Sequence, residues 1–375
     1  MLNIGFDAKR LFNNFTGLGN YSRTLLLDLS ANFPEEVYFL YTPKVKSLPA
    51  TNFFLNSPGF QVHRPKRAQK VFWRSLGIKK MLKKHEIDVF HGLSHEIPLG
   101  IQHTGIKSVV TIHDLIFKHY PKQYKPIDNL IYDAKFKYAC RHADKIVAIS
   151  ESTRKDIIDF YHIDPEKIEV IYQSCNDQFK QKWTVGKINA VLEKYNLPQD
   201  FILYVGSVIE RKNLLNIVKA IKILPKNVTP HLVVVGEGSA YKNKVHEFLA
   251  EHGMEEQVSF IAPVFEDIPA LYQQAKVFVY PSVYEGFGIP VIEALYSHTP
   301  VVTSNVSSLP EAGGPDTLQV DPASIEALAE AIEKALTDEQ LRQHMITKGY
   351  EYVKKFDGDE AAIQMMEMYR KLNIM

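Results

Sequence analysis

The sequence predicts an α/β protein built from two doubly wound parallel-sheet domains. Its 375 residues exceed the size of one ordinary domain and fit two. Short apolar runs alternate with longer helical patterns from end to end, which is typical of parallel sheets covered by helices on both faces. A polar stretch without a period, Asn176–Gly186, separates the two halves before a new strand begins at Phe201. We therefore expect domains at residues 1–176 and 177–355, followed by a terminal helix at 356–375.

The expected strands are short runs rich in β-branched and aromatic residues. In the first half they cover Asn3–Phe6, Val37–Tyr41, Val89–His91, Ser108–His113, Lys145–Ile149 and Glu169–Ile171. In the second half they cover Phe201–Val205, His231–Val235, Val258–Phe260, Val277–Tyr280, Val301–Thr303 and Leu318–Val320. The helical patterns between them include Tyr21–Leu29, Ile127–His142, Ser152–Phe160, Leu214–Ile223, Tyr241–His252, Ile268–Gln274 and Ile325–Leu336.

The final segment, Asp359–Leu372, has the pattern of an amphipathic helix that stands outside the strand–helix alternation. Ala362, Met365, Met366 and Tyr369 fall on one side of it. This spacing predicts a helix with one apolar face.

Composition argues against a nucleic-acid-binding or membrane-spanning protein. The chain is 45% apolar and 23% charged, as soluble globular proteins are, and its net charge of +1 offers nucleic acid no overall attraction. Two cysteines, Cys140 and Cys175, are too few for a disulfide framework and predict a reducing compartment. The opening residues lack the apolar core of a signal peptide, and no apolar run is long enough to span a bilayer. We expect a cytoplasmic protein, at most peripherally attached to the membrane.

A basic segment lies between Arg64 and Lys84. It contains nine Lys or Arg and no acid, with Phe72 and Trp73 among them. One interpretation is a solvated helix that precedes the strand at Val89–His91. The other is a basic, aromatic surface that contacts anionic lipid or a lipid-diphosphate acceptor at the inner membrane leaflet.

The most informative segment runs from Tyr280 to Leu295. It reads as the end of a buried strand, a glycine-bearing turn, and a helix that opens at Pro290, where proline is favoured in the first turn. Backbone N–H groups in the turn lie at the positive end of the helix dipole, which attracts phosphate. The turn residues are Gly286, Phe287, Gly288 and Ile289.

Two acidic residues flank this turn. Glu285 lies in the turn itself, and Glu293 lies one helical turn inside the helix. Helical side chains lean toward the N-terminus, so Glu293 should point at whatever the turn binds. A phosphate-binding loop between two hydroxyl-binding carboxylates suits a sugar–diphosphate–nucleoside. The alternative is an ordinary loop with two surface glutamates.

A second group of phosphate-binding residues follows the strand at Phe201–Val205. Gly206 ends the strand, and Arg211 and Lys212 precede a helix. A guanidinium fork beside an ammonium point charge predicts a diphosphate clamp. The alternative is a solvated basic turn.

Loops of the first half carry weaker signals. Gly17 and Gly19 form a degenerate dinucleotide fingerprint with Ser22 where the third glycine belongs, so they predict a loop that approaches a phosphate or sugar rather than a cofactor site. His113 ends a strand, where it can reach a cleft or serve a structural purpose.

Metal binding is not predicted. His91 and His95 have helical i, i+4 spacing, but Gly92 and Pro98 disfavour a helix there. The acidic pair in Asp357-Gly-Asp359 precedes the terminal helix instead of following a strand, so Asp359 is expected to cap that helix.

Taken together, these segments resemble the retaining GT-B glycosyltransferases of family 4, also described as glycosyl transferases group 1. The resemblance covers nearly the whole chain, and its most specific part is the pair Glu285 and Glu293 with seven residues between the acids. The similar segments are Gly17–Tyr21, Thr111–Leu115, Ala148–Ser152, Gly206 to Asn213, Gly236–Gly238, Glu285–Glu293 and Ser308–Glu311.

The resemblance implies two Rossmann-like domains facing a central cleft, with the terminal helix crossing back onto the first domain after Phe356. It also implies roles for the site residues. Arg211 and Lys212 would neutralise the donor diphosphate, helped by backbone N–H groups of Gly286–Ile289. Glu293 would bind the ribose and Glu285 the donor sugar. The remaining implied contacts are His113 to the donor sugar, and Gly236, Glu237, Gly238, Pro263 and Val264 around the nucleotide base.

The implied reaction is transfer on the front face of the donor, with the leaving phosphate oxygen taking the acceptor proton. It needs no metal or other cofactor, because cations and a helix N-terminus stabilise the leaving group. Ser207 stands where many members carry an Arg, so Arg211 and Lys212 would have to neutralise the diphosphate without that third cation.

These features predict a hexosyltransferase that builds a polysaccharide, lipopolysaccharide or lipid-linked saccharide. Gly5–Arg10 together with Gly17–Tyr21 resembles mannosyltransferase-like members, which favours GDP-mannose as donor and leaves UDP-sugars open. A non-catalytic sugar-nucleotide-binding protein is one alternative. A Rossmann oxidoreductase is another, although the second strand, Tyr38–Tyr41, lacks the acidic residue that would hold a cofactor ribose.

Overall fold

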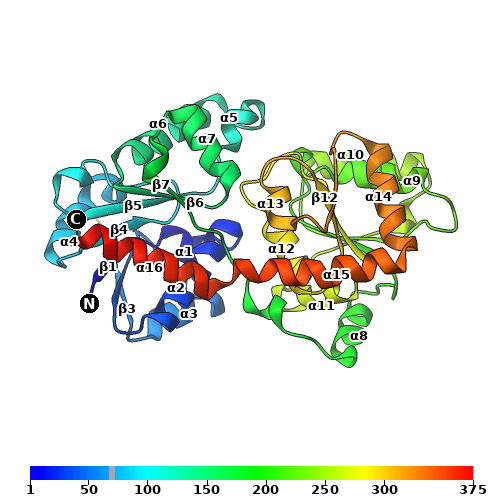
Figure 1. The fold of residues 1–375 in the computed structure, drawn as a ribbon, viewed down its shortest axis with the longest axis horizontal. Coiled ribbons are helices and arrows are strands. Elements are labelled where there is room, and N and C mark those ends of the chain that lie inside the picture. Colours follow the sequence, from blue (N-terminus) through cyan, green and yellow to red (C-terminus); the bar gives the residue numbers. More distant parts are fainter. Residues whose placement is uncertain (67–71, 375) are drawn as a thin grey trace. The chain divides into compact units, whose positions relative to one another are not determined.

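The computed structural model describes residues 1–66 and 72–374. They form two compact units: unit 1 comprises Met1–Ser174 and Phe356–Met375, and unit 2 comprises Cys175–Lys355. The sequence places this boundary at residue 176, and the structure divides the chain after Ser174. Each unit is built on a parallel β-sheet with helices around it (Figure 1), so the predicted fold class is confirmed.

Within the described residues, unit 1 contains a seven-stranded parallel sheet. The strand order β3-β2-β1-β4-β5-β6-β7 reverses direction between β1 and β4. In spatial order the strands are β3 (Phe60–His63), β2 (Val37–Tyr41), β1 (Asn3–Asp7), β4 (Val89–Gly92), β5 (Lys107–Ile112), β6 (Lys145–Ala148) and β7 (Ile168–Val170). The edge strand β3 was not predicted, because its four residues are half polar and pair with one neighbour alone.

Helices cover both faces of this sheet. Along β2, Tyr38 and Leu40 belong to one buried cluster with α2 and α16, whereas Phe39 and Tyr41 belong to another with α4 and α6. This alternation is that of a strand buried on both sides. The helices are α1 (Lys9–Asn13), α2 (Gly17–Asn32), α3 (Pro49–Asn56), α4 (Ile78–Lys84), α5 (Ile116–His119), α6 (Pro126–His142), α7 (Glu151–Tyr161) and α16 (Gly358–Ile374).

The terminal helix α16 packs against α2 within unit 1 (Figure 1, red and blue). Ala362, Met365, Met366 and Tyr369 are all buried in the α2 cluster, which confirms the predicted apolar face. The helix begins at Gly358, so the expectation that Asp359 is its cap is wrong. Asp359 lies inside the first turn and accepts a hydrogen bond from Asn32 of α2, at 2.7 Å.

Unit 2 contains a six-stranded parallel sheet in which the order β10-β9-β8-β11-β12-β13 reverses between β8 and β11. In spatial order the strands are β10 (Val258–Ile261), β9 (Leu232–Val235), β8 (Ile202–Val205), β11 (Val277–Tyr280), β12 (Val301–Ser304) and β13 (Leu318–Val320). Each was predicted to within one residue at either end.

The helices of unit 2 include three that the sequence patterns did not indicate, namely α8, the short α13 and α15. The polar stretch after the boundary ends in α8, and α15 follows α14 with Asp338 as its cap, accepting the Leu341 N–H at 2.9 Å. The apolar period of α15 is weak because few of its residues are buried. The helices are α8 (Val185–Lys194), α9 (Leu214–Ile223), α10 (Ala240–Glu251), α11 (Ile268–Gln274), α12 (Ile289–Tyr296), α13 (Leu309–Gly313), α14 (Ile325–Thr337) and α15 (Glu339–Val353).

Candidate active site

The strongest candidate site lies at the carboxyl edge of the sheet in unit 2. β8 and β11 are paired neighbours at the point where the strand order reverses. Loops that leave such a point in opposite directions open a crevice, and ligands of doubly wound folds bind there. Arg211 and Lys212 follow β8, and Glu285 follows β11. The fold therefore brings the two predicted groups of residues to one place.

A single carboxylate oxygen forms the centre of this site. Oε1 of Glu285 lies 2.9 Å from Nη1 of Arg211 and 2.9 Å from Nζ of Lys212. The hydroxyl groups of Tyr280 and Ser282 donate hydrogen bonds to the same oxygen, at 3.0 and 2.7 Å. The three charged side chains are between 11 and 14% exposed, so solvent screens their attraction weakly.

These contacts decide the charge of the cluster. Burial alone would raise the pKa of Glu285, but the neighbouring Lys212 and Arg211 outweigh it and lower that pKa to about 2. Burial lowers the pKa of Lys212, and although the Glu285 carboxylate raises it, repulsion by the Arg211 guanidinium adds to the lowering. Two cations and one anion give the cluster a net charge of +1.

The ion pairs link residues for which the sequence predicted separate binding roles. The sequence assigns Arg211 and Lys212 to a diphosphate and Glu285 to a sugar, as separate contacts. In the structure, Glu285 is the counterion of both cations. A diphosphate that binds here would therefore compete with the carboxylate for the same N–H donors.

Sequence reasoning missed two residues that hold the central carboxylate. Tyr280 is the last residue of β11, and its hydroxyl contacts both Glu285 and the Lys212 ammonium, which lies 4.9 Å from the Tyr280 ring centre. The Ser282 hydroxyl also lies 3.1 Å from the Arg211 carbonyl oxygen, next to the loop after β8. Their position could have identified them, because both are polar side chains at or directly after the carboxyl end of a buried strand.

Asn213 fixes the loop that carries the two cations. Its backbone is left-handed, with φ of 63°, a conformation that asparagine tolerates better than most residues. Its side-chain amide donates to the carbonyl oxygens of Pro281 and Pro322, at 3.1 and 2.8 Å. Asn213 thereby ties the end of the β8 loop to the loops after β11 and β13.

The glycines expected around the nucleotide base have a packing reason of their own. A Cβ on Gly236 would lie 1.9 Å from the Gly206 carbonyl oxygen, and one on Gly238 would lie 2.2 Å from the Val208 carbonyl oxygen. The Val208 N–H also bonds to the Glu237 carbonyl, at 2.8 Å. Glycine is required here because the loops after β8 and β9 touch through their backbones.

Two further residues expected to border the base are exposed at the same edge. Glu237 follows β9 and is exposed, and Val264 follows the neighbouring strand β10 and is 51% exposed. Their contact with a base stays a prediction.

The turn after β11 leads into α12 as expected. Gly286, Phe287 and Gly288 are buried, and Gly288 has φ of 127°, which favours glycine. A Cβ there would also lie 3.0 Å from the Leu309 side chain. α12 begins at Ile289 with proline in its first turn, and no side chain of the described residues caps its N-terminus. This leaves the helix N-terminus suited to an anion.

Two serines after β12 hold this turn in place. The Glu285 N–H donates to Oγ of Ser307 at 3.0 Å. Oγ of Ser308 contacts the carbonyl oxygens of Glu285 and Phe287, at 2.9 and 2.6 Å. The turn geometry is therefore fixed by a neighbouring strand as well as by its own glycines.

Glu293 differs from the expected carboxylate in its protonation. Burial raises its pKa to about 8, although the Tyr272 hydroxyl, which donates to Oε2 at 3.0 Å, opposes that rise. The group is therefore mainly a neutral carboxylic acid at pH 7. A neutral carboxyl can donate one hydrogen bond and accept others, which matches a hydroxyl partner.

In unit 1, His113 is a buried and neutral histidine. It is 4% exposed, its Nε2 lies 2.9 Å from the Leu93 carbonyl oxygen, and burial lowers its pKa to about 4. Its ring meets the Tyr21 ring edge-on at a centroid distance of 4.7 Å. These contacts hold the imidazole at the carboxyl end of β5, and its contact with a donor sugar stays a prediction.

The two glycines at the start of α2 differ in their surroundings. A Cβ on Gly19 would lie 1.8 Å from the Asn14 carbonyl oxygen, so Gly19 is required for packing of the preceding loop. Gly17 is exposed, and a Cβ there would meet nothing within 4 Å. Gly17 is thus the one of the pair that leaves space for a ligand.

Part of the basic segment Arg64–Lys84 is buried, so the expected basic, aromatic surface does not include Trp73 or Arg74. Trp73 is 3% exposed. Nε of Arg74 donates a hydrogen bond to Asp7 at 2.9 Å, and Nη1 lies 3.4 Å from Glu96. Arg74 therefore anchors the segment to the carboxyl end of β1 and to the loop after β4. Arg67 and Lys70 lie outside the described residues.

The residues considered for metal binding have other partners. Nδ1 of His91 lies 2.5 Å from the Tyr369 hydroxyl, and Nε2 lies 2.8 Å from Thr111. The His95 ring stacks on Phe136 at 4.1 Å. Within the described part of the chain, no group of three or more His, Cys, Asp or Glu side chains could hold a metal ion.

Comparisons with known proteins identify the family. The family model described as Glycosyltransferase Family 4 matches residues 16–179, and the model described as Glycosyl transferases group 1 matches residues 189–352. O-antigen chain mannosyltransferase B of Escherichia coli is 30% identical over 296 residues, which cover 78% of this chain and 76% of that protein. O-antigen chain mannosyltransferase RfbU of Salmonella typhimurium is 30% identical over 363 residues, covering 94% and 95%.

Solved structures share the whole fold. A glycosyltransferase from Rickettsia africae matches with a TM-score of 0.77 at 20% identity, covering 99% of this chain and 98% of its own. A sucrose-phosphate synthase from Thermosynechococcus elongatus matches with a TM-score of 0.76 at 21% identity, covering 99% of both chains. At these identities the likeness concerns the fold alone. Family models, relatives and fold agree, and the chain is a member of glycosyltransferase family 4 with the GT-B fold.

Proposed function

We propose that this glycosyltransferase moves a hexosyl unit from a nucleotide-diphosphate sugar to a growing polysaccharide or lipid-linked saccharide, with retention of configuration. The observation that carries the proposal is the buried cluster of Arg211, Lys212 and Glu285 at the reversal point between β8 and β11. It combines a net positive charge with a fixed carboxylate, as a diphosphate joined to a sugar requires.

The cluster supports the departure of the nucleoside diphosphate. As the bond between the sugar C1 and the phosphate oxygen breaks, its electron pair leaves with the nucleotide. Arg211 and Lys212 stabilise that negative charge, and the N-terminus of α12 adds N–H dipoles. Glu285, ionised because of its cations, faces the positive charge that develops on the sugar.

The other half of the reaction needs no protein base. The acceptor hydroxyl oxygen bonds to C1 on the face that the phosphate leaves, and its proton passes to the departing phosphate oxygen. His113 is proposed to contact the donor sugar as a hydrogen-bonding group, because burial keeps it neutral.

Mannose is the proposed sugar, and GDP the proposed carrier. The relatives at 30% identity are named mannosyltransferases of O-antigen chains, which supports mannose and a surface-polysaccharide acceptor. The opening segment, Gly5–Arg10, supports the same choice by resemblance. A UDP-sugar is the alternative donor that an assay must compare.

The reaction is proposed to need no divalent metal. Two cations and a helix N-terminus already stand at the site, and together they can neutralise a diphosphate. The decisive assay is mannosyl transfer by the purified chain in excess EDTA. Full activity is expected, and complete loss that added magnesium or manganese restores would overturn this part of the proposal.

The chain is further proposed to work in the cytoplasm, at the membrane face, through the exposed part of its basic segment. No helix of the described residues is long and apolar enough to cross a bilayer. Phe72 and Leu76 are 72 and 53% exposed beside the exposed Lys80, Lys83 and Lys84. Apolar side chains next to lysines favour an anionic lipid surface.

Two measurements test the proposal as a whole. Purified chain should consume GDP-mannose, compared with UDP-glucose, when given a saccharide acceptor, and NMR of the product should show the donor's anomeric configuration. Nucleotide binding without consumption of any donor would favour the non-catalytic alternative. For membrane contact, sedimentation with phosphatidylserine vesicles should fall in Phe72→Ser but not in Phe265→Ser, an exposed phenylalanine of unit 2.

A further inference from the structure

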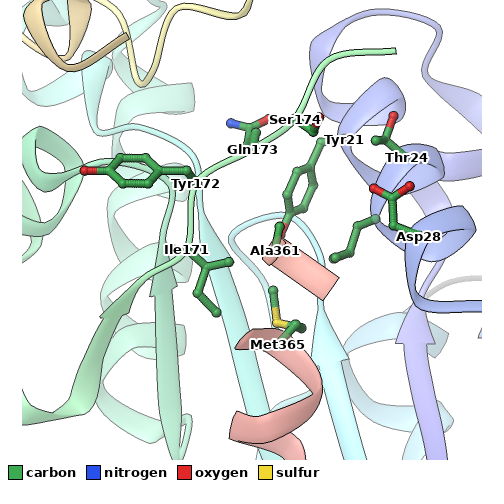
Figure 2. Close-up of a pocket in the computed structure, with 10 residues that line it drawn as sticks. Tyr21, Thr24, Asp28, Ile171, Tyr172, Gln173, Ser174, Ala361 and Met365 are labelled. Carbon is green, nitrogen blue, oxygen red and sulfur yellow. The ribbon is translucent and has the colours of Figure 1, made fainter. Parts of the chain in front are cut away.

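A groove in unit 1 lies between α6 and a π-helical turn, η2 (Trp73–Gly77). Its volume is about 240 Å³, more than the roughly 150 Å³ of an apolar protein cavity that takes benzene. By contrast, the pocket between α2, α16 and the segment after β7 (Figure 2) has a volume of about 20 Å³, which is room for about one water molecule. Of these two spaces, the groove alone has room for part of an organic ligand.

The connection between β4 and β5 forms one side of this groove. Parallel strands are usually joined by an α-helix that covers the sheet, whereas this fully described connection contains only one short 3₁₀ turn. The N–H of Leu99 donates to the Ser75 carbonyl oxygen at 2.8 Å. The N–H of Gly100 donates to the Tyr138 hydroxyl oxygen at 2.6 Å. The connection is thereby tied to η2 and to α6, so the groove is formed before any ligand binds.

The walls of the groove are mainly apolar. The uncharged residues that line it are Ser75, Ile97, Leu99, Ala134 and Tyr138. The two charged lining residues, Glu96 and Lys135, pair with each other at 3.3 Å. A hydrocarbon chain suits such walls, because it brings no polar group of its own that would need a partner.

The groove opens beside an exposed apolar face of α6. The side of α6 that faces the core carries Phe136, Ala139 and Cys140. On the opposite side, Ile127, Leu130 and Ile131 are 59, 66 and 42% exposed. Together with the exposed Ala134 they have the i, i+3, i+4, i+7 spacing of one helix face. Because Ala134 also lines the groove, the apolar surface continues from α6 into it, and such contiguous exposed surface marks an interaction site.

Positive charge surrounds this surface. The segment from Ile116 to His142, which contains α6, carries six Lys or Arg and two Asp, whereas the whole chain has a net charge of +1. The Lys135 side chain is 45% exposed at the groove, and Nζ of Lys79 lies 2.6 Å from the Leu99 carbonyl oxygen. An apolar surface bordered by lysines matches an anionic lipid, whose chain needs the first and whose phosphate needs the second.

We propose that this groove binds one hydrocarbon chain of an anionic membrane lipid, with the lipid phosphate against Lys79 and Lys135. The exposed face of α6 then lies on the same membrane surface. The inference adds a lipid-binding site to the proposed membrane contact of Phe72 and Leu76, and it does not rest on the proposed sugar transfer.

The binding test uses the full chain and n-decyl phosphate below its micelle concentration, observed by isothermal titration calorimetry. Wild type should bind. Leu99→Gln and Ala134→Gln, which place an amide in the apolar walls at exposed positions, should weaken binding by about tenfold or more. Leu130→Gln is the matched control and should bind as wild type does, because this exposed leucine of α6 does not line the groove.

Two further ligands separate the chain from the phosphate. n-Butyl phosphate, whose chain is shorter, should bind at least about tenfold more weakly than n-decyl phosphate. n-Decyl maltoside, which has the chain but no charge, should bind about fivefold more weakly. Equal binding of the two phosphates would show an anion site without a chain site and overturn the proposal. Equal binding by wild type and both groove variants would overturn it as well.

Sedimentation with phosphatidylserine vesicles tests the membrane as the source of the lipid. Sedimentation should fall in both groove variants and also in Leu130→Gln, which keeps its affinity for n-decyl phosphate. Vesicle binding that is lost in Phe72→Ser but unchanged in both groove variants would refute the groove and leave the proposed membrane contact standing. Dimerisation that Ala134→Gln abolishes, without any binding of n-decyl phosphate, would assign the groove to a second copy of the chain and overturn the proposal.

Discussion

Replacing Glu285 by glutamine should strengthen the binding of free nucleoside diphosphate while it suppresses sugar transfer. The amide keeps the size of the side chain and its ability to accept hydrogen bonds from Tyr280 and Ser282. It removes the anion that Arg211 and Lys212 share, so the net charge of the cluster rises from +1 to +2. A diphosphate then meets two cations without a competing carboxylate.

The size of the effect follows from the removed repulsion. Two unit negative charges about 5 Å apart repel by roughly 3 kcal/mol at an effective dielectric constant of 20. Solvent that enters with the ligand and salt reduce this, so we expect a gain of about 1–2 kcal/mol, or about five- to thirtyfold tighter binding. Transfer should fall by about 100-fold or more, because the variant loses a charge that stabilises the transition state.

Isothermal titration calorimetry with GDP and with UDP measures the first quantity, and initial rates of transfer measure the second. Glu256→Gln is the matched control, since this exposed glutamate lies before β10, at the opposite end of that strand from the site. It should change neither quantity. Weaker nucleotide binding in Glu285→Gln, with an intact fold by circular dichroism, would show that the carboxylate does not compete with the diphosphate.

Four further predictions concern the same site. Lys212→Ala should cost about 2–4 kcal/mol of transition-state stabilisation, seen as a 30- to 1,000-fold lower kcat/KM, and turnover within a few-fold of wild type would contradict the clamp. The lowered pKa of Glu285 contributes about 3 kcal/mol of stability above pH 4.5, which is lost as the pH falls toward 2; acid unfolding of Glu285→Gln should lack this loss. The pH dependence of stability has the opposite sign at Glu293, because its pKa is raised to about 8 in the folded state. The contribution of Glu293 to stability therefore falls as the pH rises from 4.5 to 8. Glu293→Gln should therefore gain stability relative to wild type at pH 8, while Glu293→Ala should bind free nucleotide and intact donor more weakly, and unchanged calorimetric affinity would refute its ribose role.

Local patterns along the chain were enough to specify the strands and the two-sheet architecture. A strand such as Leu232–Val235 is apolar at every position, and that pattern is stable only where both faces are covered. The terminal helix shows its apolar face through Met365, Met366 and Tyr369 for the same reason. The buried face of a helix repeats every three or four residues, and that of a strand every two residues. A short segment of sequence is therefore enough to reveal which residues are buried. β3 and α15 were not predicted from the sequence, because few of their side chains are buried and their apolar pattern is weak.

The chemistry of the site required the folded arrangement. Lys212 and Glu285 are 73 residues apart in the chain and become partners only because β8 pairs with β11. The same holds for the neutral state of Glu293, which depends on the burial of its carboxyl group in the folded protein. The sequence places Trp73 and Arg74 in a basic surface, but in the structure Trp73 is buried. Arg74 pairs with Asp7, which ends β1, and with Glu96, which lies in the loop after the neighbouring β4. Charge state and pairing depend on the distance between segments far apart in sequence, which no local pattern encodes.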